Sequence, residues 1–117
     1  MSPSKEAVKL AYEALEDKKG QNIEVIDIQG ISVIADYFMI SSGDSVNQVQ
    51  AMADNVQEEL GKAGFECSSV EGYQTANWIL LDYGDVIIHI FHKDYRDFYD
   101  LKRIWRAGKF LTKEDLM

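Results

Sequence analysis

Apolar and polar positions are patterned most clearly between Trp78 and Phe91, where two apolar segments flank Gly84 and Asp85. A Gly-Asp pair between segments rich in β-branched residues predicts a β-hairpin, because glycine readily adopts the positive φ of the first turn position. In the register that this turn sets, Trp78 lies opposite Phe91, and alternate side chains point to opposite faces of the hairpin.

The two faces of the predicted hairpin differ in polarity. One face is apolar except for a single phenol and is expected to be core: Ile79, Leu81, Tyr83, Val86, Ile88 and Ile90. The other face contains a carboxylate and an imidazole: Trp78, Leu80, Asp82, Ile87, His89 and Phe91. Both assignments depend on the turn, because a slip of one residue would exchange the two faces.

The other elements follow from periodicity and from end signals. Helical spacing predicts a surface helix that opens at Ser2-Pro3 and ends at a left-handed Gly20. A second helix begins at Ser45, which forms a capping box with Gln48, and ends between residues 61 and 64. Strands are predicted over residues 23–28, 36–42 and 67–71, and one or two short helices over residues 94–105.

This order of elements predicts an α/β or α+β fold, with helices flanking a mixed five-stranded sheet. We expect residues 1–117 to form a single domain, and the tail after about residue 107, which lacks a periodic pattern, to fray. Three modest helices are too few to cover both faces of such a sheet. The face that carries Trp78 is therefore a candidate docking surface.

Composition places the chain among soluble proteins of a reducing compartment. No run approaches the roughly 18 apolar residues of a membrane helix, and no signal-peptide pattern opens the sequence. The single cysteine, Cys67, excludes a disulfide framework within the chain, so a cytoplasmic location is expected. One cysteine and two histidines also leave little material for a zinc site.

The charge is uneven along the chain. The formal net charge is −8, with 18 acidic and 7 basic side chains in residues 1–100 and five basic against two acidic in residues 101–117. An acidic body argues against a whole-surface nucleic-acid binder and fits a basic partner. The basic tail has two readings, a contact with RNA phosphates or a solvated terminal helix.

The signals for catalysis are incomplete. The strand–turn–helix at residues 41–45 has the form of a phosphate cradle, but many helices begin this way and the lysine of a phosphate loop is absent. Asp82 and Asp85 lie across a turn and do not share a strand face, as metal-assisted transfer would require. His89 and His92 are three apart on a strand, on opposite faces. We therefore predict neither an enzyme nor a cofactor.

Three stretches resemble the ribosomal silencing factor family, also called RsfS or Iojap: DYFMISSGDSVNQVQAMAD (36–54), EGYQTANWILLDYGDVIIHIF (71–91) and RDFYDLKRIW (96–105). The resemblance implies a cytoplasmic factor that docks on large-subunit ribosomal protein number fourteen. Docked there, such a factor blocks joining of the small subunit and represses translation when nutrients are scarce. It also implies a core related to the nucleotidyltransferase fold, without that activity.

The resemblance and the second hairpin face together give a predicted partner-binding set. Trp78 and Phe91 would act as aromatic anchors within an acidic rim. The set comprises Glu71, Trp78, Leu80, Leu81, Asp82, Tyr83, Asp85, His89 and Phe91. Three alternatives stay open: Trp78 as ordinary core, a homodimer through the same face, and a small nucleotidyltransferase-like enzyme that uses the turn at residues 42–45.

Overall fold

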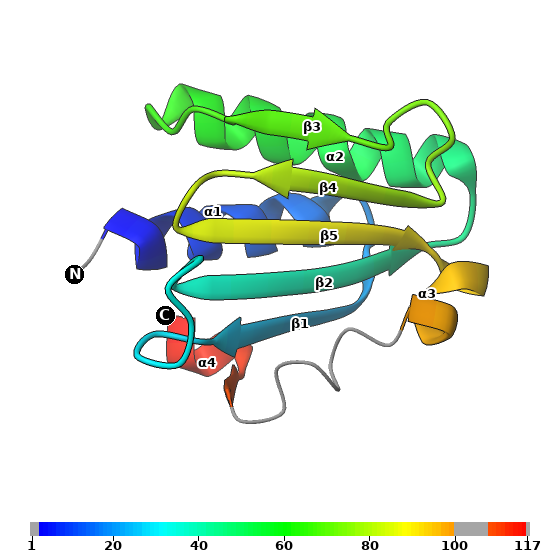
Figure 1. Ribbon diagram of the computed structural model, residues 1–117. Coiled ribbons are helices and arrows are strands. Elements are labelled where there is room, and N and C mark those ends of the chain that lie inside the picture. Colours follow the sequence, from blue (N-terminus) through cyan, green and yellow to red (C-terminus); the bar gives the residue numbers. More distant parts are fainter. Residues whose placement is uncertain (1–2, 100–107, 117) are drawn as a thin grey trace.

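Within the residues that the structure describes, the protein is built on one six-stranded mixed sheet (Figure 1). The computed structural model describes residues 3–99 and 108–116. In chain order its elements are α1 (Pro3–Asp17), β1 (Gln21–Asp27), β2 (Tyr37–Gly43), α2 (Val46–Lys62), β3 (Ser69–Glu71), β4 (Trp78–Asp82), β5 (Val86–His92), α3 (Lys93–Tyr99), β6 (Lys109–Leu111) and α4 (Lys113–Leu116). The predicted mixed α+β fold is confirmed, with one strand more than the sequence indicated.

The strand order across the sheet is β3-β4-β5-β2-β1-β6. The central pair, β2 and β5, is parallel, and every other neighbouring pair is antiparallel. Parallel neighbours need a crossover connection, which α2 begins on its way to β3. Both long helices, α1 and α2, lie behind the sheet in Figure 1, and α3 lies past the ends of β2 and β5.

The β4–β5 hairpin has the predicted register. Trp78 lies opposite Phe91, and the Tyr83 N–H donates to the Val86 carbonyl oxygen at 2.9 Å. Gly84 has a φ of 81°, and its N–H donates to the Asp82 carboxylate at 2.8 Å. A local signal, glycine at the first turn position, therefore sets which side chains share a face.

The face toward α1 and α2 is the main core, as predicted. The five apolar hairpin residues of this face are at most 1% exposed, and they pack with the apolar stripes of the two helices. Tyr83, the one phenol of the face, is half-buried, and this burial raises the pKa of its hydroxyl group. The core assignment of this face is confirmed.

The capping box of α2 also joins the two helices. The Ser45 hydroxyl accepts from the Gln48 N–H at 3.1 Å, which confirms Ser45 as the N-cap. The Gln48 side-chain oxygen accepts from the Asp44 N–H at 2.6 Å. Its amide nitrogen donates to the carbonyl oxygens of Lys18 and Lys19, at 3.1 and 3.0 Å. One glutamine thus fixes the end of α1 against the start of α2.

The end of α1 differs from its prediction. Lys19, not Gly20, has the left-handed conformation, with a φ of 61°. Gly20 is required for space, since a Cβ there would lie 2.8 Å from Met52 Cε and 2.9 Å from the Leu15 carbonyl oxygen. The glycine was a correct sign of a constraint, but the constraint is the space left by the Leu15 carbonyl oxygen, Ser41 and Met52, and not a backbone angle.

The tail is ordered where it was expected to fray. Residues 109–111 form β6 on the outer side of β1, with Phe110 opposite Ile26, and α4 follows with Leu116 buried. Thr112 and Asp115 cap α4 through a bond of 2.8 Å from the Thr112 N–H. A three-residue strand that pairs with a distant segment leaves no periodic signal, so the sequence could not show it. The helix predicted over residues 101–105 lies outside the described residues.

Candidate functional site

The strand–turn–helix at residues 41–45 is occupied by the protein's own groups. The Ser41 hydroxyl donates to the Gln21 carbonyl oxygen at 3.1 Å, and the Ser42 hydroxyl accepts from Arg96 at 2.8 Å. Arg96 in turn donates to the Glu24 carboxylate at 3.1 Å. With the Asp44 N–H bound to Gln48, a phosphate would have to displace several existing bonds.

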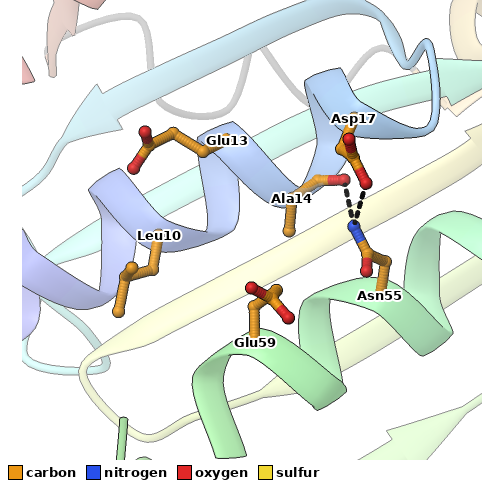
Figure 2. Close-up of a pocket in the computed structure, with 6 residues that line it drawn as sticks. All are labelled: Leu10, Glu13, Ala14, Asp17, Asn55 and Glu59. Atoms are coloured by element: carbon orange, nitrogen blue, oxygen red, sulfur yellow. Dashed lines mark hydrogen bonds between the residues drawn. The ribbon is translucent and has the colours of Figure 1, made fainter. Parts of the chain in front are cut away.

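A groove of about 340 Å³ runs between α1 and α2 (Figure 2). Across it, the Asn55 amide donates to the Ala14 carbonyl oxygen at 2.9 Å and to Asp17 at 3.4 Å. These bonds explain Asn55 as a link between the helices. Within residues 3–99 and 108–116, no three His, Cys, Asp or Glu side chains are grouped so as to hold a metal ion. The bonds that cross the groove are therefore structural links between α1 and α2.

The opposite side of the sheet, which we call the open face, carries three rows of side chains that cross the strands. The middle row joins Glu24, Ile40, His89, Leu80 and Glu71. A second row joins Phe110, Ile26, Phe38, Ile87 and Asp82. The third row joins Ser42, Phe91 and Trp78. The predicted hairpin face is therefore one part of a surface that also takes side chains from β1, β2, β3 and β6.

Burial changes across the open face. Its centre is closed, because Phe91 is 1% exposed, His89 3% and Ile40 2%. Toward β3 and β4 the surface opens, and Trp78, Leu80, Asp82 and Ile87 are half-buried. Glu71 and Asp85 are exposed at the margin. The accessible part is an apolar and aromatic patch with carboxylates around it.

Aromatic rings pack under this patch. Trp78 stacks on Phe91 with ring centroids 5.3 Å apart, and His89 lies 4.3 Å from Phe38. Stacked and tilted ring pairs at such separations add to the stability from burial alone. In the described part of the chain, Trp78 therefore packs in one aromatic layer with Phe91, His89 and Phe38.

The one polar group of this layer bonds to Trp78. The indole Nε1–H donates to His89 Nδ1 at 2.8 Å. Indole nitrogen is only a donor, so Nδ1 has the lone pair and the ring proton of neutral His89 is on Nε2. Nε2 is buried and has no hydrogen-bond partner. Burial lowers the pKa of His89 to about 4, so the ring is neutral at physiological pH.

The loop before β4 holds the Trp78 backbone. Tyr73 donates from its hydroxyl to both Asp54 oxygens at 3.0 Å, and its carbonyl oxygen accepts from Gln50 at 2.8 Å. Gly72 has a φ of 78°, and a Cβ there would overlap the Trp78 carbonyl oxygen. The loop is thus tied to α2 at one end and closed on β4 at the other.

The nine predicted partner-binding residues divide between the two faces. Five belong to the open face through the hairpin, and Glu71 joins them from β3. Asp85 lies in the exposed turn. Leu81 is fully buried beneath the helices and Tyr83 points the same way, so neither belongs to the open face.

Of the open-face residues, His89 and Phe91 form the buried layer and not the accessible patch. Sequence reasoning missed Phe38 and Ile40, which complete this layer from β2. Their only signal was the apolar run over residues 36–42. That run does not show that β2 pairs with β5.

Comparison with known proteins identifies the family. A family model described as "Ribosomal silencing factor during starvation" matches residues 1–116. The chain belongs to the ribosomal silencing factor family. The resemblance that the sequence motifs suggested is therefore confirmed.

Individual members of the ribosomal silencing factor family agree in sequence and in fold. The Bacillus subtilis protein named ribosomal silencing factor RsfS is 42% identical over 101 residues, 86% of each chain. The maize chloroplast protein named Iojap is 29% identical over 99 residues, 85% of this chain and 42% of that protein. A crystal structure of a Chromobacterium violaceum protein has a TM-score of 0.86 at 37% identity, covering 96% of this chain and 92% of that one.

Two further features of this silencing-factor chain bear on its partners. Among its described residues, no helix is long and apolar enough to cross a membrane. Of the basic tail, Lys113 bonds to Glu16 on α1 at 3.0 Å, and Lys109 is exposed. Lys102, Arg103 and Arg106 lie outside the described residues. The ion pair of Lys113 is a structural link between α4 and α1.

Gly72→Ala is expected to destabilise the protein more than Gly84→Ala. Both glycines have positive φ, which costs an L-residue about 1–2 kcal/mol. Only Gly72 is also crowded by the Trp78 carbonyl group, whereas nothing lies within 4 Å of a Cβ at Gly84. Urea unfolding should show the larger loss for Gly72→Ala. Equal losses would mean that the loop yields without strain.

Stability is expected to fall as pH drops below about 6.5, in part because of His89. Its pKa is 6.5 when unfolded and about 4 when folded, so the unfolded state binds the proton first. The contribution of neutral His89 to the free energy of unfolding is complete above pH 6.5 and is lost toward pH 4. Its size is about 1.4 kcal/mol for each tenfold difference in proton affinity between the unfolded and folded states. Urea unfolding between pH 7 and 5 should show a shallower decline for His89→Asn. Parallel declines would exclude this role of His89.

Proposed function

We propose that this chain silences translation by binding the large ribosomal subunit through ribosomal protein number fourteen. Bound there in the cytoplasm, it keeps the small subunit from joining and lowers translation when nutrients are scarce. Membership of the family supports this proposal, since its relatives are named ribosomal silencing factors. The observation that carries it is the half-buried aromatic patch on the open face, bordered by acidic side chains.

The patch has the features of a binding interface. Trp78 supplies a large anchor, and the half-buried Leu80 and Ile87 supply apolar area beside it. Hot spots of protein interfaces are typically aromatic anchors that become fully desolvated within a ring of less critical contacts. A standard interface buries about 1,200–2,000 Å² in total, so residues around the patch would also take part.

Charge supports a basic partner. Asp82 lies on the open face, and Glu71 and Asp85 lie at its margin, on a chain with a net charge of −8. Opposite charge on a ribosomal protein would speed the encounter and favour one orientation. The basic tail is too small a feature to reverse this preference, and it would contact RNA only as a secondary site.

Blocking a subunit surface requires no catalytic group. A bound protein of this size can block the small subunit sterically. The occupied turn at residues 41–45 supports a function without nucleotide chemistry, because its hydroxyl and N–H groups already have partners. We therefore propose that the chain is not an enzyme and requires no cofactor.

Trp78→Ala is expected to abolish co-sedimentation with isolated large subunits while the protein stays folded. The substitution removes the anchor, and interface anchors typically contribute about 2 kcal/mol or more, a loss of at least about thirtyfold in affinity. Tyr12→Ala, a half-buried aromatic of α1, is the control and should bind normally.

Circular dichroism should show folded protein for both variants. If Trp78→Ala sediments with large subunits like the wild type, the open face is not the docking surface. If Trp78→Ala unfolds and its folded fraction still binds, Trp78 is core.

Asp82→Asn is expected to slow association and to weaken its dependence on salt. Asparagine keeps the oxygen that accepts from the Gly84 N–H at 2.8 Å, so the turn should persist while the charge is lost. Loss of a rim charge acts mainly on the association rate. Stopped-flow association over a salt series tests this, with Glu13→Gln on α1 as the matched control. Identical salt slopes would argue against electrostatic steering by Asp82.

Two other uses of the same chain have distinct signatures. A homodimer through the open face would appear in light scattering over a concentration series, be dispersed by Trp78→Ala and compete with subunit binding. A nucleotidyltransferase-like activity would require binding of nucleotide with Mg²⁺. Calorimetry with Mg-ATP is expected to show no heat of binding.

A further inference from the structure

Among the residues that the structure describes, His89 is the buried side chain of the open face with a polar atom that lacks a hydrogen-bond partner. It is 3% exposed, and its Nε2 has no hydrogen-bond partner. Its cross-strand neighbours are Ile40 and Leu80, and its ring lies beside those of Phe38 and Phe91. A titratable group in such surroundings needs an explanation.

Stability alone does not explain a histidine at this position. A buried N–H without an acceptor is unfavourable, because the group loses its bond to water and gains none. Burial also opposes the charged form of the ring. An apolar ring of similar size would meet neither disadvantage among these neighbours. What the histidine has, and an apolar ring would not, is the acceptor at Nδ1.

That acceptor is used by Trp78. The indole Nε1–H donates to Nδ1 at 2.8 Å, and the two ring centroids lie 5.6 Å apart with 37° between the planes. Phe91 stacks on one face of Trp78 with 26° between the planes, and ring stacking by itself is weakly directional within the plane of the rings. A hydrogen bond is directional, so it selects one orientation of the indole.

We propose that His89 is a positioning residue for the docking surface: by accepting the indole N–H at Nδ1, it holds Trp78 in the orientation that the ribosomal partner meets. This inference rests on the proposed function. An anchor that is already oriented loses less conformational freedom on binding, so a partner binds it more tightly. His89 contributes to affinity without touching the partner.

Two substitutions separate positioning from packing. His89→Phe keeps an aromatic ring and removes the acceptor. His89→Asn removes the ring and keeps an acceptor, since its Oδ1 is bonded to Cγ as Nδ1 is in histidine. His92→Asn is the matched control, because it changes the other histidine and retains the acceptor for the Asp94 N–H.

Three measurements follow for each variant: thermal unfolding, solvent exchange of the Trp78 indole N–H by NMR, and affinity for isolated large subunits. Trp78→Phe assigns the indole signal. For His89→Phe we expect an unfolding temperature equal to or above that of the wild type, fast indole exchange, and affinity lower by about tenfold, the effect of one net hydrogen bond. For His89→Asn we expect slow exchange and affinity closer to the wild type.

Each other outcome is decisive. If His89→Phe binds like the wild type while Trp78→Ala does not, the positioning role is wrong and the proposed function stands. If Trp78→Ala itself binds normally, the docking surface is wrong. If His89→Phe is destabilised, His89→Asn gives the answer. Slow exchange of the indole N–H together with lost affinity in His89→Asn would overturn the positioning role.

Discussion

The parallel ladder between β2 and β5 is the constraint on which the rest of the structure depends. It runs from Tyr37 opposite Val86 to Gly43 opposite His92, at the centre of the sheet. Parallel neighbours cannot be joined by a tight turn, so the chain crosses over through α2 and returns by the β4–β5 hairpin. α1 and α2 both lie on one side of the sheet, and rings from β2, β4 and β5 pack against one another on the other side.

The features that could be predicted from the sequence are those with local causes. Gly84 sets the hairpin register, and Ser45 caps α2. Both features depend on residues close together in the chain, so the sequence was enough to predict them. The pairing of β2 with β5 and of β6 with β1 depends on segments far apart in the chain, which periodicity does not reveal. For the same reason the hairpin part of the open face could be predicted from the sequence, whereas Phe38 could not. Gly20 is a third case: the sequence showed correctly that a glycine is needed there, but the predicted reason, a left-handed backbone, was wrong.

The candidate site was predicted in the same uneven way. Alternation placed Trp78, Leu80 and Asp82 on one face correctly, because side-chain direction in a strand is a local property. The depth of a side chain is not a local property: Phe91 shares that face and is buried, in a cluster with Phe38 and Ile40 of β2. From the sequence, Trp78 and His89 could be predicted only to lie on the same face of the hairpin, and not to form a hydrogen bond. Which atoms form the bond depends on the rotamers of both side chains in the folded protein.

The lengths of the outer strands have a consequence for how such molecules meet one another. β3 and β6, which end the sheet on its two sides, are each three residues long. Unpaired strand edges attract other strands, and short edges limit that hazard. A second chain could form few backbone bonds at either margin, so continuous sheets between molecules are disfavoured. Recognition is thereby left to side chains on a face, where shape and charge can distinguish one partner from another.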